Sequence, residues 1–113
     1  YHGKKVLVTG HTGFKGTWLT RILLNAGAIV TGYSRCSEKP LSLFDLSGVK
    51  ERITHIRGDV RDMAHLKTVF DEFQPEIVFH LAAQPLVRDS YQDPVYTYET
   101  NVMGTIISFL PWL

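Results

Sequence analysis

Cysteine is almost absent from this sequence, since Cys36 stands alone among 113 residues. A single cysteine excludes an internal disulfide, and the polar neighbours Ser37 and Glu38 favour a solvated thiol over a nucleophile. Without a disulfide framework the chain suits a reducing compartment. We therefore expect a cytoplasmic location.

Net charge is also nearly absent. Twelve Lys and Arg against eleven Asp and Glu give +1 at pH 7, so no basic or acidic field indicates nucleic acid as a partner. No other His or Cys stands at metal-ligand spacing from His80, and we expect no metal site.

Long apolar runs are missing as well. No stretch approaches the roughly 20 apolar residues of a membrane span, and residues 1–5 (YHGKK) lack the apolar core of a signal peptide. We expect a soluble protein with no membrane partner. Its length suffices for one small domain and excludes two.

The informative stretch is glycine-rich and runs from Lys4 to Gly16, KKVLVTGHTGFKG. The apolar run from Val6 to Val8 is typical of a parallel strand buried on both faces. Three glycines follow, and the pattern over 17–26 then predicts a helix. The residues predicted on its apolar face are Trp18, Ile22, Leu23 and Ala26.

Each glycine has a physical role in such a turn. Gly10 permits a sharp exit from the strand, Gly13 lets a phosphate approach the backbone, and Gly16 lets the helix pack closely. The first helical amides lack intrahelical partners, and the helix dipole adds positive charge there. The pattern therefore predicts a dinucleotide pyrophosphate at the helix start.

Two alternatives remain open for this turn. It is compatible with a tight connection that binds nothing. It also resembles a mononucleotide P-loop, although such a loop ends in Gly-Lys-Ser/Thr whereas this chain has Lys15, Gly16 and Thr17 in another order.

Three further strands are predicted over 28–33, 53–59 and 76–81, with helices over 41–46, 63–73 and 96–110 and with Pro111 ending the last helix. Right-handed crossovers would join the strands into a parallel sheet of order 3-2-1-4. The expected fold class is α/β, a partial Rossmann-type doubly wound sheet with flanking helices. Its ligand crevice would lie between the first and fourth strands.

The adenosine end of such a crevice usually has a carboxylate after the second strand. Here Ser34 and Arg35 stand in its place. An arginine there can accommodate a 2′-phosphate, so the sequence does not decide between NAD and NADP. It is equally compatible with an Arg35 that is solvated and contacts no cofactor. We assign Asp59 to the adenine amino group and Asp62 to the N-cap of the helix over 63–73.

The fourth predicted strand runs into two small residues, Ala82 and Ala83. Small residues would let the cofactor lie against the backbone, although they could equally serve core packing. His80 is expected to be a hydrogen-bonded structural residue rather than a base.

Three segments resemble the extended short-chain dehydrogenase/reductases, most closely the CDP-glucose 4,6-dehydratases. They are TGHTGFKG (9–16), GDVRD (58–62) and HLAAQPLVRDSYQDPVYTYETNVMGT (80–105). Together with the patterns above, the resemblance implies an NAD cofactor held by Gly10, Thr12, Gly13, Phe14, Lys15, Ser34, Arg35, Asp59, Val60, Leu81, Ala82, Ala83 and Gln84. It implies that Arg88, Ser90 and Tyr91 lie near a nucleotide-sugar substrate, with Asn101 behind the active site.

The same family uses a catalytic Tyr-x-x-x-Lys pair on a later helix. The match in this chain, Tyr1 to Lys5, lies at the start of the first strand, away from the crevice. We therefore expect no catalytic residue here. Residues 1–113 would be a single, truncated NAD(P)-binding domain, the N-terminal portion of a sugar-nucleotide 4,6-dehydratase, a lyase acting by hydride transfer and water elimination.

Two further expectations concern this portion by itself. We expect it to be inactive, the alternative being a non-catalytic dinucleotide-binding or scaffold module. An unpaired edge strand over 77–81 and the apolar stripe Val102, Ile106 and Leu110 predict a homo-oligomer.

Overall fold

A computed structural model describes residues 1–35 and 41–112, so Cys36 and Glu38 lie outside the described residues. Four parallel strands form a sheet in the order β3-β2-β1-β4, which confirms the predicted topology. They are β1 (Lys5–Thr9), β2 (Ile29–Ser34), β3 (Thr54–Arg57) and β4 (Ile77–His80). The third strand is shorter than the predicted 53–59.

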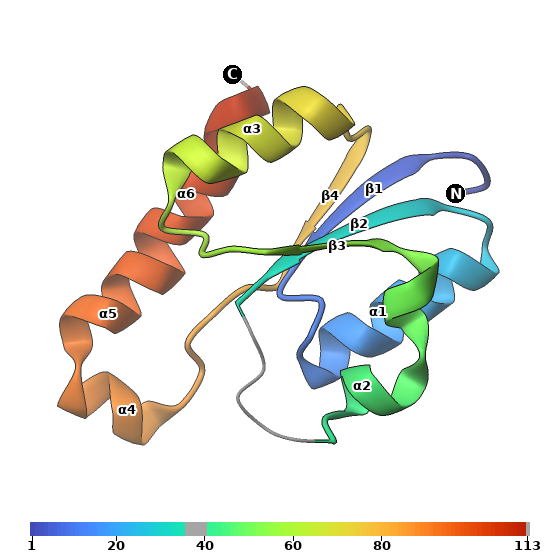
Figure 1. The fold of residues 1–113 in the computed structure, drawn as a ribbon. Helices are drawn as coiled ribbons and strands as arrows, with labels where there is room; N and C mark the ends of the chain where they lie inside the picture. The colour runs from blue at the N-terminus through green and yellow to red at the C-terminus, as the bar shows by residue number, and fades with distance from the viewer. Residues whose placement is uncertain (36–40, 113) are drawn as a thin grey trace.

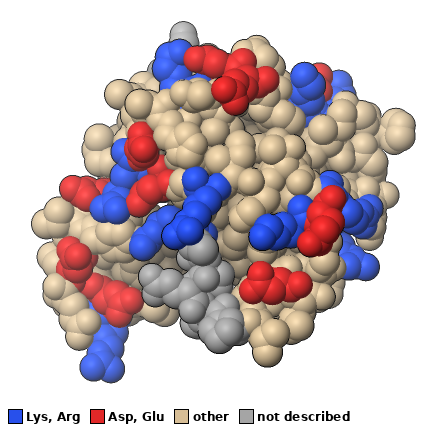
Figure 2. Space-filling model, in the orientation of Figure 1, with Lys and Arg blue, Asp and Glu red and all other residues tan. Residues whose placement is uncertain are grey.

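Helices cover both faces of the sheet (Figure 1). α1 (Phe14–Asn25) and α2 (Leu43–Ser47) lie on one face, and α3 (Met63–Phe73) and α6 (Gly104–Phe109) lie on the other. None of the helices in the described part of the chain is long and apolar enough to cross a membrane. On the face shown in Figure 2, acidic and basic side chains are interspersed.

β1 shows why the sheet is buried on both sides. Val6 and Val8 belong to the core cluster under α1, whereas Leu7 belongs to the cluster under α3. All three are fully buried. Because successive side chains point to opposite faces, the apolar run fills two cores at once.

The helix α1 differs from its prediction. It begins at Phe14 instead of Thr17, and Trp18 and Ile22 are 52% and 60% exposed. Thr17 and Thr20 are buried instead, because their hydroxyls donate to the carbonyls of His11 (3.2 Å) and Gly16 (2.7 Å). A pattern based on apolar residues does not predict that Thr17 and Thr20 are buried. Their hydroxyls can be buried because each forms a hydrogen bond to a nearby backbone carbonyl.

The chain after β4 is more broken than the single predicted helix over 96–110. It forms α4 (Val87–Gln92), α5 (Pro94–Tyr98), a π-helical segment η2 (Glu99–Met103), α6 and a 3₁₀ turn η3 (Leu110–Trp112). Asp93 caps α5 by accepting from the amide of Tyr96 at 3.0 Å, with Pro94 at the first helical position. The prediction that Pro111 ends the helix is wrong, since it lies inside η3.

Other local signals agree with the sequence. The helix α3 has the predicted bounds, and the Asp62 carboxylate accepts from the His65 amide at 3.0 Å as its N-cap. α2 begins two residues later than predicted, because the Ser42 hydroxyl caps it and accepts from the Asp45 amide. A 3₁₀ turn, η1 (Val49–Arg52), then leads into β3.

Candidate functional site

The glycine turn lies at the carboxyl end of β1. Gly10 has φ +75°, a conformation that side chains rarely adopt, and its amide donates to the Tyr33 carbonyl at 2.9 Å. A Cβ on Gly10 would stand 2.7 Å from the backbone nitrogen of Ala82, and one on Gly16 would overlap the Gly10 carbonyl oxygen. Glycine is therefore required at both positions by the neighbouring main chain.

Gly13 is different because the protein leaves space around it. An added Cβ would meet only the Gly10 oxygen, at 3.5 Å, among the described atoms. Gly13 is the N-cap of α1, no side chain caps this end, and the first helical bond runs from Thr17 N to Gly13 O at 2.8 Å. The N–H groups of Phe14, Lys15 and Gly16 therefore have no hydrogen-bond acceptor within the helix, and such unpaired N–H groups can bind an anion.

The segment after β4 is predicted to form the second side of the crevice. The Leu81 amide donates to the Thr9 carbonyl at 3.0 Å, and the Ala82 amide donates to the Thr9 hydroxyl at 3.3 Å. The structure thus brings Leu81 and Ala82 against the glycine turn, as the sequence predicts, with exposed Ala83 directly after them.

Gln84 is buried, and its side chain is fully engaged within the protein. Its amide oxygen accepts from Leu86 N at 2.7 Å, and its amide nitrogen donates to Leu86 O and to the Thr97 hydroxyl, each at 3.1 Å. The Asn101 side chain in turn bonds both the nitrogen (2.7 Å) and the oxygen (3.1 Å) of the Gln84 backbone. The hydrogen bonds between Gln84 and Asn101 therefore fix the segment after β4 to η2.

His80 is a structural residue, as predicted. Its Nδ1 lies 2.7 Å from the Thr9 hydroxyl and its Nε2 lies 3.1 Å from the Thr105 hydroxyl. Burial lowers its pKa and so favours the neutral ring.

The segment predicted to hold the adenosine begins where β2 ends, at Ser34. The Ser34 hydroxyl lies 2.8 Å from the Thr12 hydroxyl, which joins two predicted cofactor residues. Val60 is buried in the core under α3 and α6, so its side chain is directed away from solvent.

Asp59 has a partner that the sequence analysis missed. Arg61 binds its carboxylate, with Nη2 2.8 Å from Oδ2, and Nη1 of Arg61 lies 3.1 Å from the Glu99 carboxylate. The hydrogen bond from Arg61 lowers the pKa of Asp59. The spacing of Asp59 and Arg61 in GDVRD could have indicated this pair.

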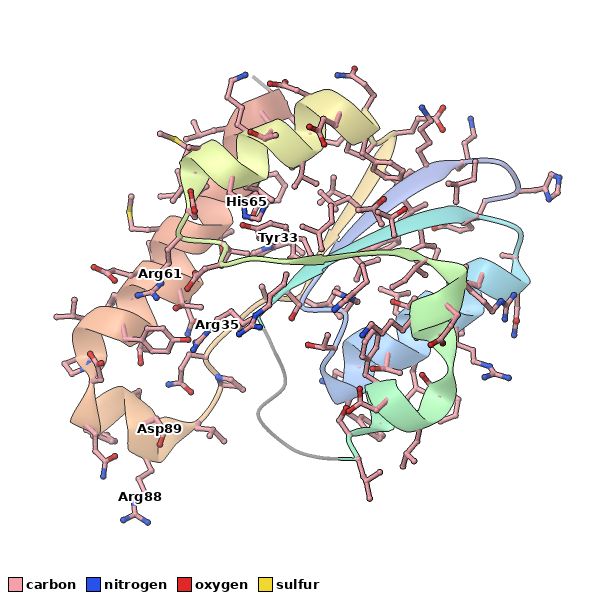
Figure 3. All side chains as sticks on the ribbon, viewed as in Figure 1. Tyr33, Arg35, Arg61, His65, Arg88 and Asp89 are labelled. Atoms are coloured by element: carbon pink, nitrogen blue, oxygen red, sulfur yellow. The ribbon has the colours of Figure 1, made fainter. Side chains whose placement is uncertain are left out.

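Tyr33 is a second residue that was missed. Its ring is fully buried beneath Gly58, and its hydroxyl donates to the Asp59 carbonyl at 2.8 Å. His65 of α3 approaches the same hydroxyl at 3.3 Å, and the two side chains face one another in Figure 3. Burial raises the pKa of Tyr33 to about 12, so this residue positions the Asp59 segment as a neutral phenol.

A histidine pair lies below the glycine turn. Nε2 of His11 is 2.7 Å from Nδ1 of His55, and both rings contact Phe44. His11 is fully buried over Gly32, whose missing side chain leaves room for the ring. Its Nδ1 has no hydrogen-bond partner among the described residues.

The predicted substrate residues lie on α4. Tyr91 is 84% exposed, and the Ser90 hydroxyl donates to Val87 O within the same helix at 2.6 Å. Arg88 projects outward, at a distance from Arg35 and Arg61 (Figure 3). Within the described ranges, no group of three His, Cys, Asp or Glu is placed to hold a metal ion.

The sequence matches a known family model over residues 7–108, described as GDP-mannose 4,6 dehydratase. CDP-glucose 4,6-dehydratase of Salmonella typhimurium is 52% identical over 106 residues, covering 94% of this chain and 30% of that protein. UDP-glucose 4-epimerase of Mycolicibacterium smegmatis is 35% identical, covering 90% of this chain and 32% of that protein. The chain thus spans about a third of the length of these relatives.

Solved structures agree on the fold. An epimerase of Methanothermobacter thermautotrophicus superposes with a TM-score of 0.86 at 36% identity, covering 98% of this chain and 32% of that one. UDP-glucose 4-epimerase of Thermus thermophilus, in complex with NAD, gives a TM-score of 0.82 at 32% identity, covering 95% and 33%.

Proposed function

Because the chain belongs to the GDP-mannose 4,6-dehydratase family, within the extended short-chain dehydrogenase/reductases, we propose that it is the NAD-binding portion of a sugar-nucleotide 4,6-dehydratase. The observation that carries the proposal is the space at Gly13. There an uncapped helix start lies beside a glycine turn that is packed against Ala82.

The residues present fit a dinucleotide. The amides after Gly13 and the exposed Lys15 would hold the pyrophosphate. Ser34, Arg35 and the Asp59–Val60 segment would hold the adenosine, and the Leu81–Ala83 segment would hold the nicotinamide side. When bound, NAD supplies an acceptor that takes a hydride from a substrate and can return it.

The substrate proposed for the longer protein is a nucleotide sugar, with CDP-glucose favoured by the 52% identity to the Salmonella typhimurium enzyme. Arg88, Ser90 and Tyr91 stay proposed for that substrate. We also propose that residues 1–113 act as one NAD(P)-binding domain of a cytoplasmic enzyme.

These residues are proposed to bind without turnover. A base that removes a hydroxyl proton near pH 7 is needed for hydride transfer, and a tyrosine serves only if positive charge stabilises its phenolate. The tyrosines of α4 and α5, Tyr91, Tyr96 and Tyr98, are followed four residues later by Val95, Thr100 and Val102. The alternative function, a non-catalytic binding or scaffold module, would use the same site.

The test is titration of ¹⁵N-labelled protein with NAD, followed by amide chemical shifts. Saturable shifts are expected at Gly10, Gly13 and Ala83, with Gly48, the C-cap of α2, as an unaffected reference. Absence of saturable shifts at the glycine turn up to millimolar NAD would refute the proposed cofactor site.

A further inference from the structure

Tyr96 of α5 is contacted by arginines from two other segments. The Arg35 guanidinium carbon lies 5.3 Å from the Tyr96 ring centroid, and that of Arg61 lies 4.7 Å from it. Arg35 also donates to the Tyr96 hydroxyl. Figure 3 shows Arg35 and Arg61 close together on the side of the sheet nearer α5. Cations within about 6 Å of an aromatic face are attracted to it.

The two arginines have different charge environments. Arg61 is paired with Asp59 at 2.8 Å and with Glu99 at 3.1 Å. Arg35 has no carboxylate within ion-pair distance among residues 1–35 and 41–112, and Tyr96 is its aromatic partner. Arg61 thus compensates the two local carboxylates. Among the described residues, Arg35 makes no ion pair and acts on Asp59 only at longer range, where it helps to lower the pKa of that carboxyl.

The position of Arg35 determines which anion it can meet. It directly follows Ser34 at the carboxyl end of β2, where dinucleotide sites hold the adenosine ribose. A phosphate on the ribose 2′-oxygen is an anion whose oxygens can accept two parallel hydrogen bonds from the planar fork of a guanidinium. A neutral 2′-hydroxyl needs no such cation.

We infer that Tyr96 determines cofactor specificity, because by holding Arg35 beside Ser34 it enables the site to bind the 2′-phosphate of NADP as well as NAD. This rests on the proposed function, since it assumes a dinucleotide in the crevice. Tyr96 acts as a positioning residue. Its ring and hydroxyl restrict a side chain that otherwise samples many rotamers, and such preorganisation lowers the cost of binding.

Calorimetric titration with NAD and with NADP tests the inference on four proteins: the unchanged chain, Arg35→Ala, Tyr96→Leu and Tyr96→Phe. The unchanged chain should bind both cofactors with Kd values within tenfold of each other. Arg35→Ala and Tyr96→Leu should raise the Kd for NADP about tenfold and that for NAD less than twofold. Tyr96→Phe keeps the ring and should recover part of the NADP affinity.

Tyr98→Leu is the matched control, because Tyr98 lies on the same helix and is 69% exposed. It should change neither Kd, and thermal melting should show all variants folded at the assay temperature. Equal weakening of NAD and NADP in Tyr96→Leu would make Tyr96 merely structural and overturn the inference. The inference would also be overturned if the unchanged chain bound NADP more than a hundredfold more weakly than NAD. That result would leave the proposed NAD-binding function intact. Binding of neither cofactor would overturn both.

Discussion

His11 and His55 meet with their rings inclined at 65° in an edge arrangement, and Nε2 of His11 lies 2.7 Å from Nδ1 of His55. A hydrogen bond between two imidazoles holds one proton, so one nitrogen donates and the other accepts. The residues come from the glycine turn and from β3, and their bond ties the turn to the neighbouring part of the sheet.

The histidine pair makes the fold sensitive to acid. Burial, with His55 as the second cause, lowers the pKa of His11 from 6.5 to about 4. Between these values the unfolded chain binds more protons than the folded one, so stability is present above pH 6.5 and is lost as the pH falls toward 4. We expect the free energy of unfolding to drop by up to about 3 kcal/mol across this window.

Urea unfolding at pH 7 and pH 4.5 measures this loss. His11→Gln should show a smaller difference between the two pH values, whereas the exposed His2→Gln control should match the unchanged chain. An unaltered pH difference in His11→Gln would assign the acid sensitivity to other groups.

Gly13→Val should weaken NAD binding more than tenfold while the fold is retained, because the added side chain occupies the space where the pyrophosphate would approach. The protein itself tolerates a Cβ there, whose nearest described neighbour is Gly10 O at 3.5 Å. Gly16→Val is the contrast, since its Cβ overlaps the Gly10 carbonyl and the variant should lose stability. Calorimetry and thermal melting separate the two effects, and unchanged NAD affinity in Gly13→Val would locate the site elsewhere.

No turnover is expected from this chain when it is mixed with NAD or NADP and CDP-glucose. The expected result is no reduced-nicotinamide absorbance and no 4-keto-6-deoxy sugar above the protein-free control, because none of Tyr91, Tyr96 and Tyr98 is followed four residues later by the lysine that would lower its pKa. Product that persists after removal of host dehydratases would show that the catalytic groups lie among these residues.

A homo-oligomer is expected from the apolar surface on α6 and its neighbours. Val102, Ile106 and Leu110 are 47%, 47% and 41% exposed, and β4 is an edge of the four-stranded sheet. Such surfaces favour association. Sedimentation should show a species larger than a monomer that Ile106→Glu dissociates, with the exposed Thr68→Glu on α3 as control. A monomer at every concentration would contradict this.

The strand, turn and helix around Gly10 could be predicted because their signals are local. β-branched residues favour an extended backbone and glycines permit a positive φ, whatever residues lie elsewhere in the chain. The same is true of Asp62, which caps the helix that follows it.

The pairings inside the site could not be predicted in this way. His11 meets His55 across 44 positions, and Arg35 meets Tyr96 across 61. Such partners depend on how the strands and helices pack, which residue types alone do not specify. The buried Thr17 and Thr20 show a related limit, because hydrophobicity patterns assign such residues to solvent.

The contact between Gly10 and Ala82 has a consequence for how such a protein can change over time. At Gly10 the glycine turn lies against the backbone of Leu81 and Ala82 with no room for a side chain, so main-chain atoms determine how closely these two segments approach. Exposed side chains beside this contact, such as Phe14 and Ala83, can then be exchanged without changing the distance between the two backbones. Substitutions of such exposed side chains could therefore alter what the two segments bind while the main-chain contact between Gly10 and Ala82 stays as it is.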